Sequence, residues 1–207
     1  LLESSLTIAD LVKNAKERGY GALALTDFQS LSASIDFYNA CRAAAIQPIL
    51  GLTIAPSGVF AAEQAAPLLV YALDHPGYQA LLKLSTQVMT SETLLSLADL
   101  QPYLSHLAVI TPAYAAELPE LVVNDLPQAQ RYVQRLQALA PAQVRIGVSL
   151  QPEGQPYVAA LKQLSQLSNV PLIALEDVQY LDPQDAFSVT VLQHIKAGTT
   201  IEDTTTQ

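Results

Sequence analysis

A few polar residues of this sequence stand where an α/β protein places its chemistry, directly after short apolar stretches. Asp27 follows the apolar run 22–26, and Asp177 follows Glu176 after a second run. A carboxylate that a strand delivers into a loop is typical of a metal ligand or a base, and its natural neighbour there would be a histidine. Phe28 stands in that place instead. A hydrolytic metal site needs three or more ligands, so this set is thin for one.

Each acid has a second interpretation without chemistry. Asp27 could cap a helix that starts near Ser30 or bind loop amides, because aspartate is a favoured capping and turn residue. Glu176 and Asp177 could act as an acid and base pair. Adjacent residues of an extended segment point in opposite directions, however, so hydrogen bonding within the loop is the competing interpretation.

The remaining reactive side chains show no ligand spacing. His75, His106 and His194 form no HxH, HExxH or DxH pattern and read as surface or helix-end residues. Cys41 lies on the apolar face of a predicted helix and reads as a small core residue. The sequence contains no GxxxxGK[ST], GxGxxG or GxSxG motif.

The elements that must position these residues alternate between strands and amphipathic helices. Thr7 can cap a first helix in which Asp10 is placed for a capping box and Gly19 is the stop. Parallel strands are predicted near 22–26, 48–53, 68–73, 107–111, 144–150 and 170–175. Further helices are predicted near 32–45, 75–89, 92–104, 127–140 and 157–164, with a last one from Asp182-Pro183 to Gly198. This alternation favours a closed or nearly closed β/α barrel, with an open doubly wound sheet as the alternative.

Composition excludes several classes of protein. The 207 residues carry a formal net charge of −9, which disfavours direct contact with DNA. One cysteine and no signal peptide favour a reducing, cytoplasmic compartment. No apolar run reaches the ~18 residues of a membrane span. The sequence opens within an apolar segment and without methionine, as an excerpt of a longer chain would.

Four stretches together resemble one known family. They are LLESSLTIADLVKNAKERGYGALALTDF, AIQPILGL, LDHPGYQALLKLST and PLIALEDVQYLDPQDAFSVTVLQHIKAGTTI. In order and spacing they are similar to the PHP (polymerase and histidinol phosphatase) domain at the amino terminus of the bacterial DNA polymerase III α subunit. The resemblance implies a PHP domain over 1–201 and a polar tail over 202–207. It also implies a distorted seven-stranded, TIM-like (β/α) barrel whose first strand would precede Leu1.

The resemblance further implies where a metal site would lie. Active members hold a cluster of metals, usually three, in the barrel mouth and hydrolyse phosphate esters there. Phe28 replaces the histidine of an Asp-His motif, Thr53 replaces a glutamate, and Gln179 replaces the histidine of the closing Asp-x-His motif. Pro67, Ala113 and Gln151 fall where further ligands are expected. Of the acids, Asp27 and Asp177 remain, and both are expected at the same barrel end.

These replacements imply a degenerate domain without catalytic residues or cofactor. Its expected role is to support the remainder of a replicative DNA polymerase (a nucleotidyltransferase) or to dock another replisome subunit, such as a proofreading exonuclease. The alternative is a Zn- or Mn-dependent phosphoesterase or 3′–5′ exonuclease whose other ligands precede Leu1. An independent small-molecule β/α-barrel enzyme is a third interpretation, weakened by the lack of an acid and base set. Phe28 is expected to be buried in the refilled mouth, so that Phe28→Ala would cost about 3–5 kcal/mol.

Overall fold

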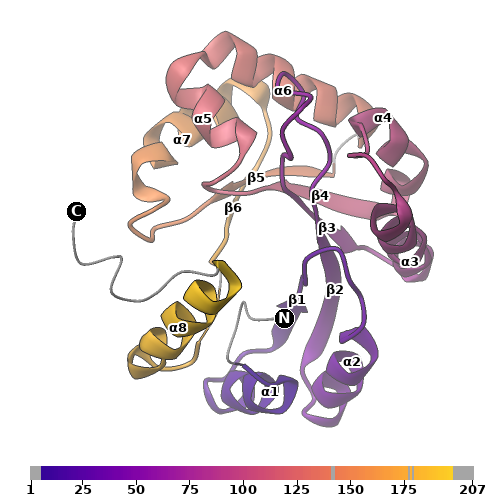
Figure 1. Cartoon of the computed structure of the whole chain (residues 1–207), viewed down its shortest axis with the longest axis vertical. Coiled ribbons are helices and arrows are strands. Elements are labelled where there is room, and N and C mark those ends of the chain that lie inside the picture. The colour runs from indigo at the N-terminus through magenta and orange to yellow at the C-terminus, as the bar shows by residue number, and fades with distance from the viewer. Residues whose placement is uncertain (1–5, 141–142, 177, 179, 198–207) are drawn as a thin grey trace. The chain divides into compact units, whose positions relative to one another are not determined.

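A computed structural model describes residues 6–140, 143–176, 178 and 180–197 of the chain (Figure 1). The chain forms two compact units. The smaller consists of Leu1–Leu23, Asp36–Pro48 and Asp177–Gln207, and the larger consists of Ala24–Ile35 and Ile49–Glu176.

Helices and strands alternate much as the sequence predicts. The strands are β1 Ala22–Leu25, β2 Gln47–Ile54, β3 Leu68–Ala72, β4 Leu107–Thr111, β5 Val144–Val148 and β6 Leu172–Ala174. The α-helices are α1 Ile8–Glu17, α2 Ser34–Ala43, α3 His75–Thr90, α4 Leu97–Leu100, α5 Glu117–Asn124, α6 Leu126–Leu139, α7 Val158–Ser168 and α8 Ala186–Ala197. Short 3-10 helices are η1 Gln101–His106, η2 Gln155–Tyr157 and η3 Pro183–Asp185.

The six strands form one sheet in the order β1-β2-β3-β4-β5-β6. A doubly wound sheet would interrupt this order at a switch point, because its chain reverses direction across the sheet. The consecutive order therefore agrees with the predicted β/α barrel type and not with its alternative.

The prediction that all strands are parallel is wrong for β3. It pairs antiparallel with both neighbours, with Leu52 opposite Val70 in β2 and Val70 opposite Val109 in β4. No helix separates β2 from β3. Their connection instead carries the antiparallel bridge Ser57↔Ala65 and returns the chain as a hairpin does. The carboxyl end of β3 therefore lies at the opposite end of the strands from the carboxyl ends of β2, β4, β5 and β6.

The pairs β4–β5 and β5–β6 are parallel, as expected from the helices that connect them. Within the larger unit, α3, α6 and α7 lie along one side of β3 to β6 (Figure 1). Gly147 allows close strand approach, because a Cβ there would collide with the carbonyl oxygen of Thr111 and the side chain of Leu175.

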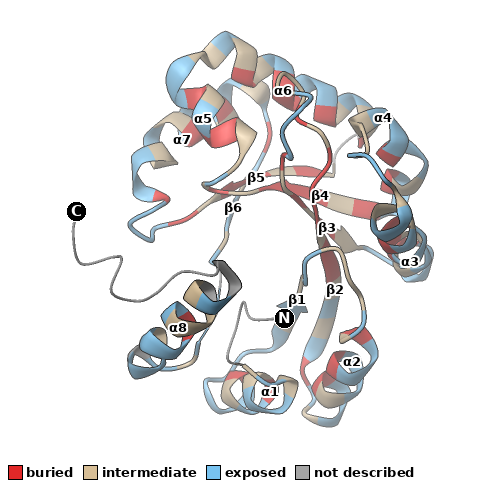
Figure 2. Cartoon of the chain, viewed as in Figure 1, coloured by how far each residue is buried: buried red, intermediate tan, exposed pale blue. Residues whose placement is uncertain are grey.

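One apolar core fills the larger unit. Figure 2 shows its buried residues concentrated in the strands and on the helix faces turned toward them. Fully buried members include Leu52, Ile54, Leu68, Val70, Leu107, Val133, Ile146 and Leu161. In the smaller unit, buried side chains include Val12, Phe37, Cys41 and Val189. Cys41 is thus a core residue as predicted, and its burial raises the pKa of the thiol.

Local signals at helix ends hold where they can be checked. The Thr7 hydroxyl oxygen accepts a hydrogen bond from the Asp10 amide at 3.1 Å, which begins α1 as predicted. Gly19, just past the helix, has φ +79°. Gly198, the predicted end of the last helix, lies outside the described residues. The described part of the chain contains no helix long and apolar enough to cross a membrane.

Candidate functional site at the strand ends

The carboxyl ends of β1 and β2 bring Asp27, Phe28 and Thr53 together. Phe28 and Thr53 form an isolated parallel bridge. The Thr53 amide donates to the Asp27 carbonyl at 3.1 Å, and the Gln29 amide donates to the Thr53 carbonyl at 2.8 Å. These backbone bonds extend the pairing of the two strands past the end of β1. Three of the residues that the sequence singled out are thus neighbours in the fold.

The side chains of Thr53 and Phe28 at this end of the sheet have structural surroundings. The Thr53 hydroxyl donates to the Thr26 carbonyl at 2.9 Å, so its proton already serves a backbone acceptor. Phe28 contradicts its prediction, because 48% of it is exposed and it fills no buried mouth. The expected large cost of Phe28→Ala therefore falls away.

A second cluster forms where β5 and β6 end. The Glu176 carboxylate accepts hydrogen bonds from the Ser149 hydroxyl at 3.0 Å and from the Leu150 amide at 3.3 Å. Ser149 is buried, and its hydroxyl oxygen accepts in turn from the Gln151 amide at 3.1 Å. Glu176 thus follows the interpretation of loop hydrogen bonding. Gln151 is exposed and opens the turn that leads into η2.

Two predicted positions cannot be placed. Asp177 and Gln179 lie outside the described residues, so the expectation that Asp27 and Asp177 share one barrel end stays a prediction. Pro67 directly precedes β3, and the buried Ala113 lies two residues after β4.

Sequence reasoning missed a pair at the other edge of the sheet. Nδ1 of His106 lies 2.7 Å from Oδ2 of Asp74, across the antiparallel pair β3 and β4. Asp74 also caps α3, accepting from the Gly77 amide at 2.8 Å. The Gly77 bond, and after it the His106 bond, hold the pKa of Asp74 below its usual value. The run Asp74-His75-Pro76-Gly77 signals the cap in the sequence, with proline in the first turn of the helix. His106 is 32 residues away, and no local pattern predicts its contact with Asp74.

Glu117 is a further polar residue that the sequence did not single out. Its two carboxylate oxygens accept from the amides of Val59 and Phe60, each at 2.7 Å. Arg135 stacks on the Phe60 ring 4.8 Å from its centroid and donates to the Val59 carbonyl at 3.2 Å. Both contacts anchor the connection between β2 and β3.

The helix that begins at Glu117, α5, was not predicted, although Leu118, Leu121 and Val122 follow helical spacing.

Among the side chains that the structure describes, those at these strand ends do not fit a metal cluster. Within residues 6–140, 143–176, 178 and 180–197, no group of three or more His, Cys, Asp or Glu side chains lies together in a way that could hold a metal ion. Phe28 has no donor atom, and the Thr53 hydroxyl is directed at a backbone carbonyl.

The consecutive strand order and the polar residues at the strand ends define the chain as an α/β protein of the barrel type. Comparison with known sequences shows its family. Residues 1–152 match the PHP domain family, and the chain belongs to that family. It is 32% identical over 211 residues to DNA polymerase III subunit alpha of Bacillus subtilis (strain 168), an alignment that covers 98% of this chain and 18% of that protein. The same subunit of Halalkalibacterium halodurans is 29% identical over 208 residues, again covering 98% and 18%. The chain therefore spans about a fifth of the length of these relatives.

A solved structure supports the fold. An amidohydrolase from Chromobacterium violaceum, with bound sulfate and no metal, superimposes with a TM-score of 0.58 at 11% identity, over 92% of this chain and 93% of that one. At this identity the likeness concerns the fold alone. Together with the consecutive strand order, it confirms the predicted fold class.

Proposed function

We propose that this chain is a non-catalytic PHP domain of a DNA polymerase III α subunit, where it supports the remainder of the subunit and docks a partner such as a proofreading exonuclease. The pairing of Phe28 with Thr53 carries this proposal. The resemblance places a histidine and a glutamate at these positions in metal-binding relatives. A phenyl ring and a hydroxyl committed to the Thr26 carbonyl take their place.

The environment of Glu176 supports the same interpretation. The Glu176 carboxylate is engaged by a buried hydroxyl and a backbone amide, as a structural acid is. A general base would instead present an oxygen within reach of a substrate proton.

The relatives suggest the larger assembly. They are DNA polymerase III α subunits, and the chain spans 18% of the length of the Bacillus subtilis subunit. In this proposal the parent chain is a DNA-directed DNA polymerase, its nucleotidyltransferase centre lies outside these residues, and the first partner of the domain is the remainder of that subunit. The net charge of −9 supports contact with protein rather than with DNA.

Metal analysis and a nuclease assay test the proposal. The full-length protein, including the residues that precede Leu1, is purified without chelators and its bound zinc and manganese are measured. A 3′-labelled single-stranded DNA and bis(p-nitrophenyl) phosphate are then offered with added Mn²⁺ or Zn²⁺. We expect substoichiometric metal and no hydrolysis that depends on Asp27. Stoichiometric metal, or hydrolysis that Asp27→Ala abolishes, would instead support a phosphoesterase or 3′–5′ exonuclease whose other ligands precede Leu1.

A further inference from the structure

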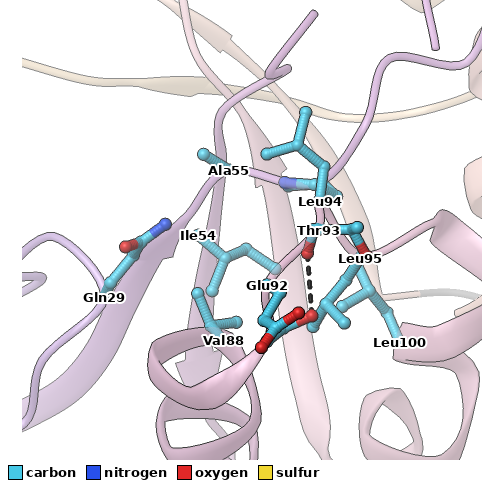
Figure 3. A pocket seen from close by; sticks show the side chains of 11 residues that line it. Gln29, Ile54, Ala55, Val88, Glu92, Thr93, Leu94, Leu95 and Leu100 are labelled. Carbon is cyan, nitrogen blue, oxygen red and sulfur yellow. Dashed lines mark hydrogen bonds between the residues drawn. The ribbon is translucent and has the colours of Figure 1, made fainter. Parts of the chain in front are cut away.

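A pocket of about 290 Å³ lies in the larger unit, between the end of β2 and the segment that follows α3 (Figure 3). Its apolar lining includes Ile54, which is fully buried, and Val88 and Leu95. In Figure 3 the side chains of Gln29 and Glu92 flank that of Ile54. The pocket thus combines an apolar wall with polar side chains, among them those of Gln29 and Glu92.

The backbone of Gln29 is fixed in an unusual conformation. Its φ of +57° lies in the left-handed region, which is uncommon for a residue other than glycine. Two hydrogen bonds hold it there: its amide donates to the Thr53 carbonyl at 2.8 Å, and its carbonyl accepts from the Ser85 hydroxyl at 2.8 Å. Backbone strain of this kind gathers at binding sites, and Gln29 lines this pocket.

The polar groups of the pocket have unused acceptor capacity. Among the described residues, neither the Gln29 amide group nor the Glu92 carboxylate has a side-chain hydrogen bond or an ion pair. α3 ends at Thr90 with no basic residue in its last turn, so the partial negative charge of the helix end is not balanced within the helix. Glu92 follows two residues later and adds a full negative charge. The pocket therefore favours a cation with several donors.

We propose that this pocket receives an arginine side chain from a segment of a partner protein. The guanidinium group presents five N–H donors in a planar fork, which suits the Glu92 carboxylate. Its aliphatic stem packs on Val88 and Leu95, which line the pocket and are only partly buried. Lysine fits less well, because an ammonium group is a compact and strongly hydrated charge.

Charge and the exposed rim of the pocket favour a protein segment as the source. The volume of about 290 Å³ lies at the lower limit of the range of about 300–1,000 Å³ that is typical of small-molecule sites, and it accommodates one side chain. Leu94, which also lines the pocket, is 43% exposed and offers an apolar contact to the residue beside the arginine. A net charge of −9 steers a basic segment toward the chain. The inference rests on the proposed docking role and assigns it a place and a chemistry.

Titration of the ¹⁵N-labelled chain, followed by NMR, tests the inference. The probes are N-acetyl-argininamide, its neutral isostere N-acetyl-citrullinamide, and the peptide acetyl-Leu-Arg-Leu-amide. We expect the arginine compounds to shift the amides of Gln29, Ala55, Thr93 and Leu95 in a saturable way, with the peptide at least threefold tighter than the amide. The citrulline compound should bind at least fivefold more weakly than its arginine counterpart.

Two variants make the test specific. Glu92→Gln keeps the shape of the side chain and should weaken arginine binding at least fivefold, whereas Glu63→Gln removes an exposed acid that does not line the pocket and should leave it unchanged. The spectrum of each variant away from the substitution reports whether the fold is kept. Equal binding of arginine and citrulline, shifts at other residues, or an unchanged affinity of Glu92→Gln would overturn the pocket assignment. Equal affinity of peptide and amide would overturn the protein segment as its source. Either failure leaves the metal and nuclease results of the proposed function as they stand.

Discussion

Phe28 and Thr53 pair through their backbones in a parallel bridge past the end of β1, and Phe28 is 48% exposed. The bridge fixes the strand end with backbone groups, whereas the ring contributes little burial. Backbone hydrogen bonds therefore stabilise these two positions, where the resemblance places metal ligands, and burial of the Phe28 side chain contributes little.

This exposure sets the cost of removing the ring. Phe28→Ala should lower the free energy of unfolding by about 1 kcal/mol, because half of the ring already contacts water. Phe37→Ala, the matched control at a fully buried phenylalanine, should cost about 3–5 kcal/mol. Urea unfolding of both variants measures the difference. Equal losses would show that Phe28 is covered in solution.

The hydrogen bonds of Glu176 should stabilise the ends of β5 and β6. Glu176→Ala leaves the buried Ser149 hydroxyl without its acceptor and should cost about 1–2 kcal/mol, while Glu176→Gln, which keeps an acceptor, should cost less than about 0.5 kcal/mol. A double-mutant cycle with Ser149→Ala should give a coupling of about 0.5–1 kcal/mol. The exposed Glu153→Ala serves as the control, at less than about 0.5 kcal/mol. Zero coupling would contradict a structural role for this pair.

Tyr132 should make the protein sensitive to alkali. Burial, and secondly the negative charge of Glu117, raise the pKa of Tyr132 above its ordinary value of 10.0. The unfolded chain then releases this proton at a lower pH than the folded one, so the contribution to stability is full below pH 10 and declines as pH rises beyond it. Its slope is about 1.4 kcal/mol per pH unit. In urea unfolding between pH 9 and 11, Tyr132→Phe should reduce the decline, whereas Tyr38→Phe at an exposed tyrosine should not. An unaltered slope in Tyr132→Phe would show that this phenol ionises in the folded protein.

Asp74 should contribute to stability at neutral pH and lose that contribution in acid. Its pKa is held below the ordinary value of 3.8 by the Gly77 amide and then by His106. For a lowered carboxyl pKa, the stabilisation is present above the unfolded value and is lost as pH falls below it through the folded value. Melting temperatures of the wild type and Asp74→Asn should therefore differ at pH 6 and converge below pH 3.8. A difference that stays constant with pH would show that the ionisation of Asp74 does not contribute to stability, and would contradict this prediction.

Local sequence alone determined most of the elements and the outline of the candidate site. The strand at 107–111 and the cap at Thr7 follow from apolar runs and capping residues, which act within a few positions of the chain. The thin set of ligands around Asp27, Phe28 and Thr53 was also visible in the sequence, because it depends on residue type.

The tertiary structure decided what depends on residues far apart. The antiparallel direction of β3 follows from a connection without a helix, and strand direction leaves no mark in a short apolar run. The pair Asp74–His106 forms only because that reversal brings the end of β3 beside the start of β4. Exposure of Phe28 likewise depends on which elements cover the strand end, and periodicity reports a buried face only within one element. Pairing, direction and coverage are properties of the sheet as a whole, and the fold settles them by packing its apolar core.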